Sequence, residues 1–151
     1  MGRVQASIVI KAPVGEVWNY YADVDRLQDW IPGGNIMKFE WLSPPPKRVG
    51  SRFRISIQAA GRTSTWIAEM TEMVKNKKGA YKLVEGDLKR YEESFEFEPV
   101  GEETKVTSKM EYELPYHFLG KLLDTLSVNR SIRADIQAML RRLKTNVERL
   151  P

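Results

Sequence analysis

The sequence contains no cysteine and a single histidine, His117, among its 151 residues. Disulfides and thiolate chemistry are therefore excluded, and one histidine leaves little with which to build a transition-metal site. The chain also lacks a Gly-rich phosphate loop, a Ser-His-Asp arrangement and any metal-ligand spacing. We therefore expect no metal and no cofactor, and any catalysis would rest on carboxylate, lysine, arginine, tyrosine or serine side chains.

No apolar run approaches the roughly 18 to 20 residues that a membrane-spanning helix requires. The first residues also lack the charged-then-apolar pattern of a signal peptide. A length of 151 residues, with 42% hydrophobic and 29% charged residues, is typical of one globular domain. We expect a single domain over residues 1–151, cytoplasmic and without integral membrane association.

The sequence also has no large excess of positive or negative charge, because the net charge is only +4. The basic residues occur as scattered pairs. Such pairs, of which Lys47/Arg48 is one, are typical of solvated loops and helix faces, although they could attract an anionic ligand, a lipid surface or RNA. Most aromatic residues fall on the apolar face of the predicted strands, which argues against a stacking platform for nucleic acid. Nucleic acid is not an expected partner, whereas a protein partner stays open.

Alternation of apolar and polar residues, the pattern of half-buried strands, recurs along most of the chain. Gly- and Pro-containing turns separate the strands. The strands are expected at residues 3–11, 36–42, 51–58, 62–74, 80–86, 90–98 and 104–114. Apolar residues at helical spacing predict two short helices between the first two strands, over 12–23 and 23–34, and the pattern after Pro115 is helical to the end.

Turn positions predict how the strands pair, because a slip of one residue turns every side chain to the other face. A turn at 60–61 places Ile55 opposite Trp66, and a turn within 76–79 places Val74 opposite Tyr81. A turn at 100–103 places Tyr91 opposite Tyr112.

The turn around residues 86–89 leaves two alternatives. A four-residue loop would put Glu92 and Ser94 on the apolar side, whereas an odd loop or a bulge would put Tyr91, Phe95 and Phe97 there. We choose the odd loop because it buries the aromatic side chains.

The order of elements resembles the helix-grip fold of the superfamily of START domains, the birch-pollen allergen and polyketide cyclases (SRPBCC). The matching stretches are "IKAPVGEVWNYYADVDRLQDWIP" (10–32), "PVGEETKVT" (99–107) and "LLDTLSVNRSIRADIQAMLRRLKTNVE" (122–148). The hairpin departs from the family pattern at Glu103, where a second glycine would stand. The resemblance covers essentially the whole chain. It implies an α+β fold in which a curved antiparallel sheet of seven strands wraps around a long C-terminal helix, with two short helices between the first two strands.

The resemblance also implies a cavity between the sheet and the terminal helix. In that position its lining would comprise Trp66, Met70, Tyr81, Leu83, Tyr91, Glu93, Phe95, Met110, Tyr112, Leu119, Leu122, Leu123 and Leu126. An aromatic and methionine-containing wall suits a lipid, an isoprenoid, a sterol-like molecule or a polyketide ring system. The alternative is that the same residues form a solid core. The terminal helix favours a cavity, because its apolar stripe shifts at residues 127–129 and its first half could then cover something other than the sheet.

Three further features have two interpretations each. Glu93 would lie among apolar side chains, where burial raises the pKa of a carboxyl and makes it a candidate general acid or base, unless a bulge or a basic neighbour accounts for it. The segment 43–50, "SPPPKRVG", is either a rim over the cavity or a connector. The aromatic residues of the two short helices, with Trp18 and Trp30 among them, either close one end of the cavity or fill the core.

Three functions stay open. The first is binding or transport of a hydrophobic small molecule or lipid in the internal cavity. The second is a polyketide cyclase/dehydratase-like enzyme that uses the same cavity, and the third is a protein- or ribosome-interaction module. We favour the first because of the apolar sheet face and the displaced helix stripe, whereas members of the superfamily differ in ligand and chemistry.

Overall fold

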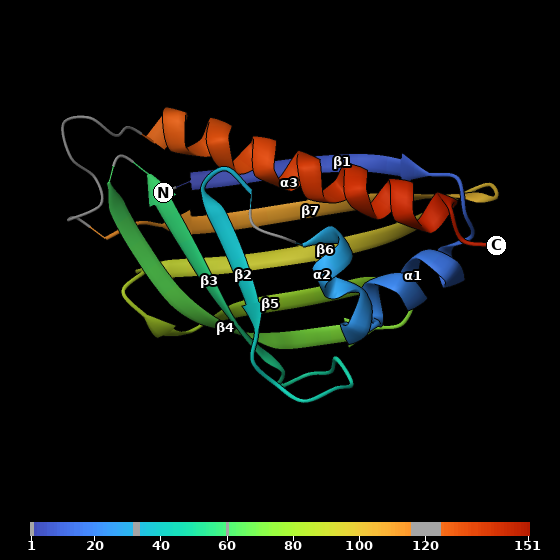
Figure 1. Cartoon of the computed structure of the whole chain (residues 1–151), viewed down its shortest axis with the longest axis horizontal. Helices are drawn as coiled ribbons and strands as arrows, with labels where there is room; N and C mark the ends of the chain where they lie inside the picture. The colour runs from blue at the N-terminus through green and yellow to red at the C-terminus, as the bar shows by residue number, and fades with distance from the viewer. Residues whose placement is uncertain (1, 32–33, 60, 116–124) are drawn as a thin grey trace.

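The computed structural model describes residues 2–31, 34–59, 61–115 and 125–151. Its strands are β1 (Gly2–Ile10), β2 (Met37–Trp41), β3 (Arg52–Ala59), β4 (Arg62–Val74), β5 (Lys78–Gly86), β6 (Arg90–Val100) and β7 (Glu103–Glu113). Its helices are α1 (Val14–Ala22), the short 3-10 helix η1 (Val24–Arg26), α2 (Leu27–Trp30) and α3 (Thr125–Glu148). The predicted helix-grip fold of the α+β class is confirmed, with α3 lying along the sheet and two short helices between β1 and β2 (Figure 1).

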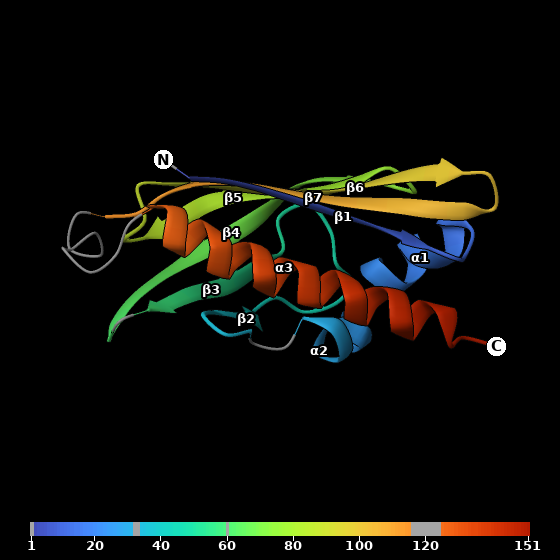
Figure 2. The ribbon, with the colours of Figure 1, turned by 90° about the horizontal axis from the view of Figure 1, so that it is seen from above.

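All seven strands form one antiparallel sheet in the order β1-β7-β6-β5-β4-β3-β2. Seen from above, α1, α2 and α3 lie on the same side of the sheet, and β2 and β3 bend round toward that side (Figure 2). The curvature therefore turns one face of the sheet inward around the helices. None of the described helices is both long and apolar enough to cross a membrane.

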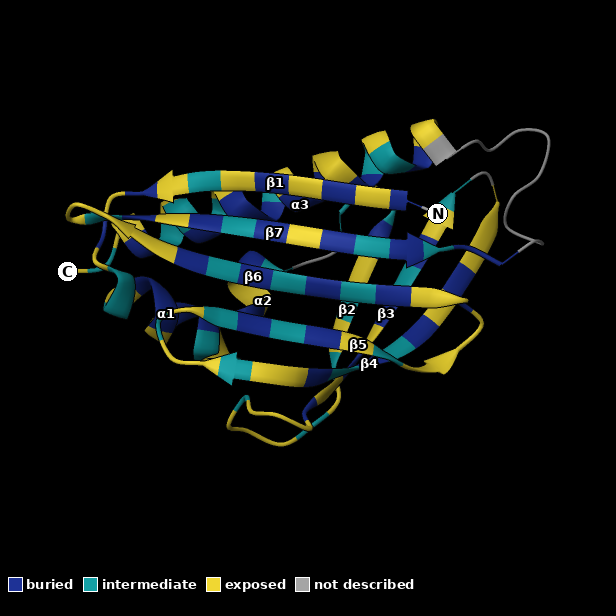
Figure 3. Ribbon diagram, turned by 180° about the vertical axis from the view of Figure 1, so that it is seen from behind, coloured by how far each residue is buried: buried dark blue, intermediate teal, exposed yellow. Residues whose placement is uncertain are grey.

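The two faces of the sheet differ in burial because apolar and polar residues alternate along the strands. Figure 3 shows the resulting bands of buried and exposed residues from behind. The outer face carries partly exposed ion pairs, such as Arg52 with Glu69 at 3.0 Å and Arg90 with Glu111 at 2.8 Å. Exposed pairs of this kind contribute only about 0–1 kcal/mol each, so the buried inner face supplies most of the stability.

Two of the predicted pairings are confirmed residue by residue. Ile55 lies opposite Trp66 in the β3–β4 hairpin. In the β6–β7 hairpin, Tyr91 lies opposite Tyr112, and Phe95 and Phe97 are both buried. The odd-loop interpretation of residues 86–89 is therefore correct, and burial of aromatic side chains was a sound criterion for it.

The predicted pairing of Val74 with Tyr81 is wrong. Val74 lies opposite Lys78, and Tyr81 lies opposite Met70. The turn is tighter than expected, because Asn76 adopts a left-handed conformation with φ of 63° that asparagine tolerates. A register shift between Met70 and Glu72 then restores the inward direction of Tyr81, since one extra residue on a strand reverses the alternation.

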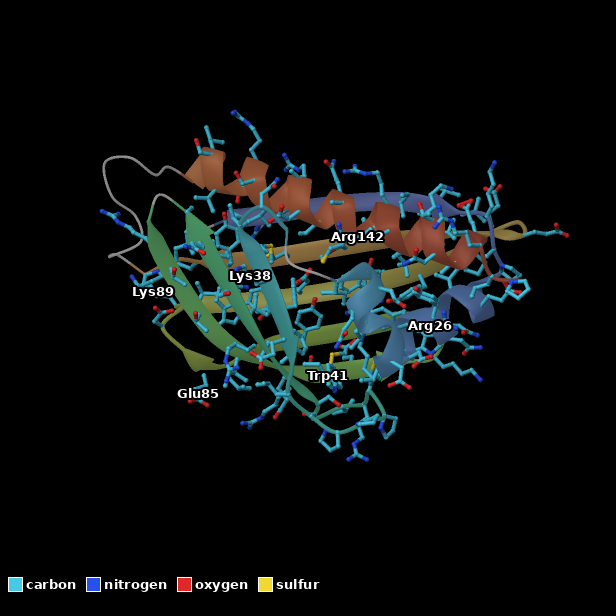
Figure 4. All side chains as sticks on the ribbon, viewed as in Figure 1. Arg26, Lys38, Trp41, Glu85, Lys89 and Arg142 are labelled. Atoms are coloured by element: carbon cyan, nitrogen blue, oxygen red, sulfur yellow. The ribbon has the colours of Figure 1, made fainter. Side chains whose placement is uncertain are left out.

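Helix α3 is fixed to the rest of the molecule through polar contacts of its inner face. The carboxylate of Asp135 accepts hydrogen bonds from the backbone N–H groups of Asn35, Ile36 and Met37, at 2.7, 2.9 and 2.9 Å. The Arg142 Nε–H donates to the Trp30 carbonyl oxygen at 3.1 Å, and Figure 4 shows Arg142 on α3. These contacts hold the start of β2 and the end of α2 against α3.

The predicted change of helix phase at 127–129 falls inside α3, which is helical without interruption from Thr125 to Glu148. Leu119, Leu122 and Leu123, which belong to the apolar stripe before the change, lie outside the described residues. His117 lies outside them as well.

Candidate functional site

A pocket of about 730 Å³ opens between the short helices and the curled end of the sheet. Its described lining comprises Tyr21, Val24, Asp25, Leu27, Gln28, Trp30, Ile31, Phe39, Glu40, Trp41, Lys47, Phe53, Met70, Tyr81 and Phe95. Residues of α1, η1 and α2 form one side, β2 and Lys47 form the other, and β3 to β6 form the floor. Figure 4 shows Arg26 on the short helices and Trp41 on β2, on either side of this region.

An unbroken run of aromatic rings forms the floor. Phe53 packs edge-on against Tyr81 with ring centroids 4.5 Å apart, and Tyr81 lies 6.4 Å from Phe95. Phe95 in turn contacts Tyr21 at 5.5 Å and Trp30 at 5.7 Å. Aromatic pairs at these separations are mutually stabilising, so the floor is a rigid apolar surface that links β3 to the short helices.

Tyr21 is held in place by a close approach to the sheet. A Cβ at Gly79 would lie 1.9 Å from the Tyr21 hydroxyl oxygen, so only glycine leaves room for this side chain. Tyr21 is fully buried. Burial raises the pKa of its hydroxyl well above the ordinary value, and the Glu93 charge adds to the shift. The combination fixes the ring that supports one side of the pocket.

Several buried donors around the pocket find no hydrogen-bond partner within the described part of the chain. They are the Tyr21 hydroxyl and the indole Nε1–H groups of Trp30 and Trp41. Because buried polar groups in folded proteins are nearly always satisfied, these three groups are exceptions, and none of them is exposed to solvent.

Lys47 extends from the segment between β2 and β3 into the wall of the pocket. Its amine donates a hydrogen bond to the Tyr21 carbonyl oxygen at 3.2 Å and lies 3.5 Å from the centre of the Tyr21 ring. Desolvation lowers the pKa of this amine from 10.5 to about 7. The position of Lys47 answers one open question, since the segment 43–50 does border the pocket.

Behind the floor lies a buried polar cluster, the Glu93 cluster, formed by Tyr81, Tyr91, Glu93 and Ser108. Tyr91 donates a short hydrogen bond to the Glu93 carboxyl, and Ser108 donates to the other oxygen at 3.3 Å. Tyr81 also hydrogen-bonds with Glu93 and with Tyr91. Desolvation raises the pKa of Glu93 above its usual range, and the three hydrogen bonds oppose the shift without cancelling it.

The predicted inward direction of Glu93 is correct, since the side chain is only 3% exposed. Glu93 is not part of the described pocket lining, however, whereas Tyr81, which hydrogen-bonds with the carboxyl, is. Burial also raises the pKa of the Tyr81 hydroxyl, and the neighbouring Glu93 charge raises it further. The cluster therefore presents one tyrosine to the pocket and keeps its carboxyl away from water.

The structure divides the predicted cavity residues into three groups. Met70, Tyr81 and Phe95 line the pocket. Trp66, Tyr91, Glu93, Met110 and Tyr112 are buried but outside the described lining, and Leu83 is half-buried outside it. Tyr112 instead donates a hydrogen bond to the Asn129 side chain of α3, and burial raises its pKa to about 12. Leu119, Leu122 and Leu123 lie outside the described residues.

The placement of Leu126 in a cavity wall is wrong, because its side chain is 75% exposed. Val128 is buried and follows Leu126 by two positions, which corresponds to roughly 200° around a helix. The two side chains therefore point in nearly opposite directions.

Sequence reasoning missed one side of the pocket. Phe39 and Trp41 of β2, Phe53 of β3 and Lys47 all line it, but none was a predicted site residue. The alternation of residues 37–41 contained a signal for Phe39 and Trp41, since both share one face of a strand. No signal singled out Lys47, because the course of a proline-rich segment depends on what it packs against. Trp18, in contrast, belongs to the core alone, with its ring 5.2 Å from that of Phe97.

The family model described as polyketide cyclase / dehydrase and lipid transport matches residues 1–148. The chain belongs to this family. Among curated proteins, no sequence matches this chain. The family and the predicted resemblance agree, and both support a hydrophobic ligand-binding fold.

Solved structures agree with this assignment. TTHA0849 from Thermus thermophilus is 27% identical to this chain, with a TM-score of 0.76 and 96% of each chain covered. The Zhui aromatase/cyclase from Streptomyces is 19% identical, with a TM-score of 0.71, 97% of this chain covered and 93% of that one. A START superfamily protein from Mycobacterium smegmatis is 17% identical, with a TM-score of 0.69 and both chains covered completely. The last two likenesses concern the fold alone.

Proposed function

We propose that this protein binds a hydrophobic small molecule or lipid in the pocket between its short helices and its sheet. The observation that carries the proposal is the volume of about 730 Å³, which falls in the range of small-molecule sites. The lining is mostly aromatic and aliphatic, with a few polar groups at fixed places.

A substitution that fills the pocket tests the proposal. Val24 of η1 lines the pocket and is only partly buried, so Val24→Trp would occupy the cavity without replacing a core residue. We expect the affinity for the neutral fluorescent probe N-phenyl-1-naphthylamine to fall at least about tenfold, which corresponds to about 1.4 kcal/mol. The measurement is a fluorescence titration of each purified protein.

The matched control is Val84→Trp, because Val84 is 43% exposed on β5 and outside the described lining. This variant should bind the probe as the wild type does. A wild-type protein that shows no saturable binding, or a Val24→Trp variant that binds unchanged, would contradict binding in this pocket.

A second candidate function is proton-transfer catalysis on a bound carbonyl compound, as in a cyclase or dehydratase. The Glu93 cluster favours it, because Tyr81 faces the pocket while its hydroxyl contacts a carboxyl of raised pKa. A protonated Glu93 can donate to Tyr81, which leaves the tyrosine free to donate to a carbonyl oxygen in the pocket. Glu93 then acts as a positioning residue, and Tyr81 as the catalytic acid.

This second function predicts that the protein accelerates exchange of the methyl protons of 2-acetonaphthone in deuterium oxide, followed by NMR. Tyr81 would donate to the carbonyl oxygen while a solvent base removes the methyl proton, and the enol would then take up a deuteron from solvent. Tyr81→Phe should lower the acceleration by about a hundredfold, the usual contribution of one acid–base group. Tyr20→Phe is the matched control, since Tyr20 lies on α1 outside the described lining. Absence of any acceleration by the wild type would remove this candidate and leave binding as the function.

A further inference from the structure

Lys47 places an amine without an anionic partner from the described residues in the wall of the pocket. Among the described lining residues it is the one basic side chain. No carboxylate of the described residues forms an ion pair with it, and its recorded contacts are the Tyr21 carbonyl oxygen and the Tyr21 ring. An ammonium group has three donors, so one hydrogen bond leaves most of its capacity unused.

An ammonium group in such surroundings is costly. Removal from water disfavours the charged form, because the ammonium group loses its hydration. An oxygen partner of opposite charge can replace that lost hydration. The Tyr21 ring and carbonyl oxygen provide part of the stabilisation that the ammonium form needs, because both present negative electrostatic potential to the amine. A ligand that brings an ionised oxygen would supply the rest of this stabilisation through a charge-assisted hydrogen bond. Such a bond is about twice as strong as a neutral one.

We propose that the pocket selects apolar molecules that carry a carboxylate, and that the Lys47 amine binds this carboxylate. The inference rests on the proposed binding function and adds the chemical class of the ligand. The acidic end would lie over Tyr21, between the short helices and the segment that follows β2. The apolar body would then lie on the aromatic floor formed by Phe53, Tyr81 and Phe95.

Two carboxylates also line the pocket, but neither opposes an acidic ligand strongly. Glu40 forms an ion pair with Arg54 at 2.5 Å, so its charge is compensated. Asp25 is exposed, and solvent and salt screen an exposed charge. The other titratable groups of the described lining are Tyr21 and Tyr81, whose raised pKa values keep both neutral. Lys47 therefore dominates the potential where its amine lies.

Binding of a carboxylate should also take up a proton. The free amine has a pKa of about 7 and is mostly neutral at pH 8, whereas a bound carboxylate favours the ammonium form. By linkage, the affinity for the acid should be highest below pH 7 and should fall by up to about tenfold per pH unit above it.

The experiment is isothermal titration of the full chain with 2-naphthoic acid and with its uncharged isostere 2-naphthamide. At pH 6.5 we expect the acid to bind at least about tenfold more tightly than the amide. At pH 8, titrations in buffers of different ionisation enthalpy should show uptake of up to about 0.9 proton per acid bound, and none for the amide.

Substitutions at Lys47 separate charge from structure. Lys47→Met should remove both the preference for the acid and the proton uptake, while the amide still binds. Lys47→Arg should keep the preference and lose the uptake, since arginine stays charged at both pH values. Lys105→Met, an exposed lysine of β7, is the matched control and should behave as the wild type.

The outcomes distinguish the two proposals. Equal affinity of the wild type for acid and amide, or a preference that survives in Lys47→Met, overturns the role of Lys47 and leaves the binding function intact. Failure of both probes, together with failure of the neutral N-phenyl-1-naphthylamine, overturns the binding function and this inference with it.

Discussion

Replacement of Asp135 by alanine is expected to lower the free energy of unfolding by about 3–5 kcal/mol, because three backbone donors lose one shared acceptor. The carboxylate is 3% exposed and accepts from three successive N–H groups at 2.7 to 2.9 Å. A donor left without a partner costs about 1–3 kcal/mol when it is buried, and of the three hydrogen bonds that of Met37 is buried and the other two are part-buried. Urea unfolding followed by tryptophan fluorescence measures the change.

The same substitution has a consequence for the pocket. Asp135 fixes the residues that lead into β2, and β2 supplies Phe39 and Trp41 to the lining. We therefore expect weaker binding of N-phenyl-1-naphthylamine even under conditions in which the variant is folded. Glu102→Ala, in the exposed turn before β7, is the control and should change stability by less than about 0.5 kcal/mol. Equal effects of the two substitutions would contradict the structural role of Asp135.

Replacement of Glu93 by leucine is expected to lower the free energy of unfolding by about 2–4 kcal/mol. Leucine fills a similar volume but accepts no hydrogen bond, so the hydroxyls of Tyr91 and Ser108 lose their partner inside the sheet. Tyr81 and Tyr91 still hydrogen-bond with each other, which limits the loss. Urea unfolding followed by tryptophan fluorescence measures the change.

Glu93→Gln is the matched variant, because glutamine keeps an acceptor and carries no charge. The folded state raises the pKa of Glu93 above the ordinary value of 4.5, so it binds more protons than the unfolded state above that pH. Wild-type stability relative to the glutamine variant should therefore fall as the pH rises from 4.5 to the folded-state pKa, by at most about 1.4 kcal/mol per pH unit, and then level off. A difference that is constant from pH 4 to pH 8 would show that Glu93 has the same pKa in both states.

Local patterns were sufficient for most of the sheet. The hairpin that joins Ile55 to Trp66 and the one that joins Tyr91 to Tyr112 follow from turn length and from the alternation of side chains. The buried position of Glu93 follows from the same argument, since it shares a face with Tyr91 and Phe95. In each case the strands have one face that must be buried, and a shifted register would expose the aromatic residues.

Where an irregular residue intervenes, the same reasoning fails. The register shift between Met70 and Glu72 changes which residues of β4 and β5 lie opposite each other. No residue type in this part of β4 predicts such a shift. Leu126 shows the corresponding failure in a helix, because leucines at helical spacing predict an apolar stripe but do not say where the helix leaves the core.

The sequence by itself determined the class of fold, the order of the elements, the polar and apolar faces of the sheet and the burial of Glu93, because these depend on periodicities of two and of 3.6 residues. Only the tertiary structure decided where the pocket opens and that Lys47 faces it. The pocket is bounded by segments far apart in the chain, from Tyr21 to Phe95, and Lys47 reaches it through a segment without periodicity. Its low pKa depends on desolvation by the neighbours that folding brings together, which no local pattern specifies.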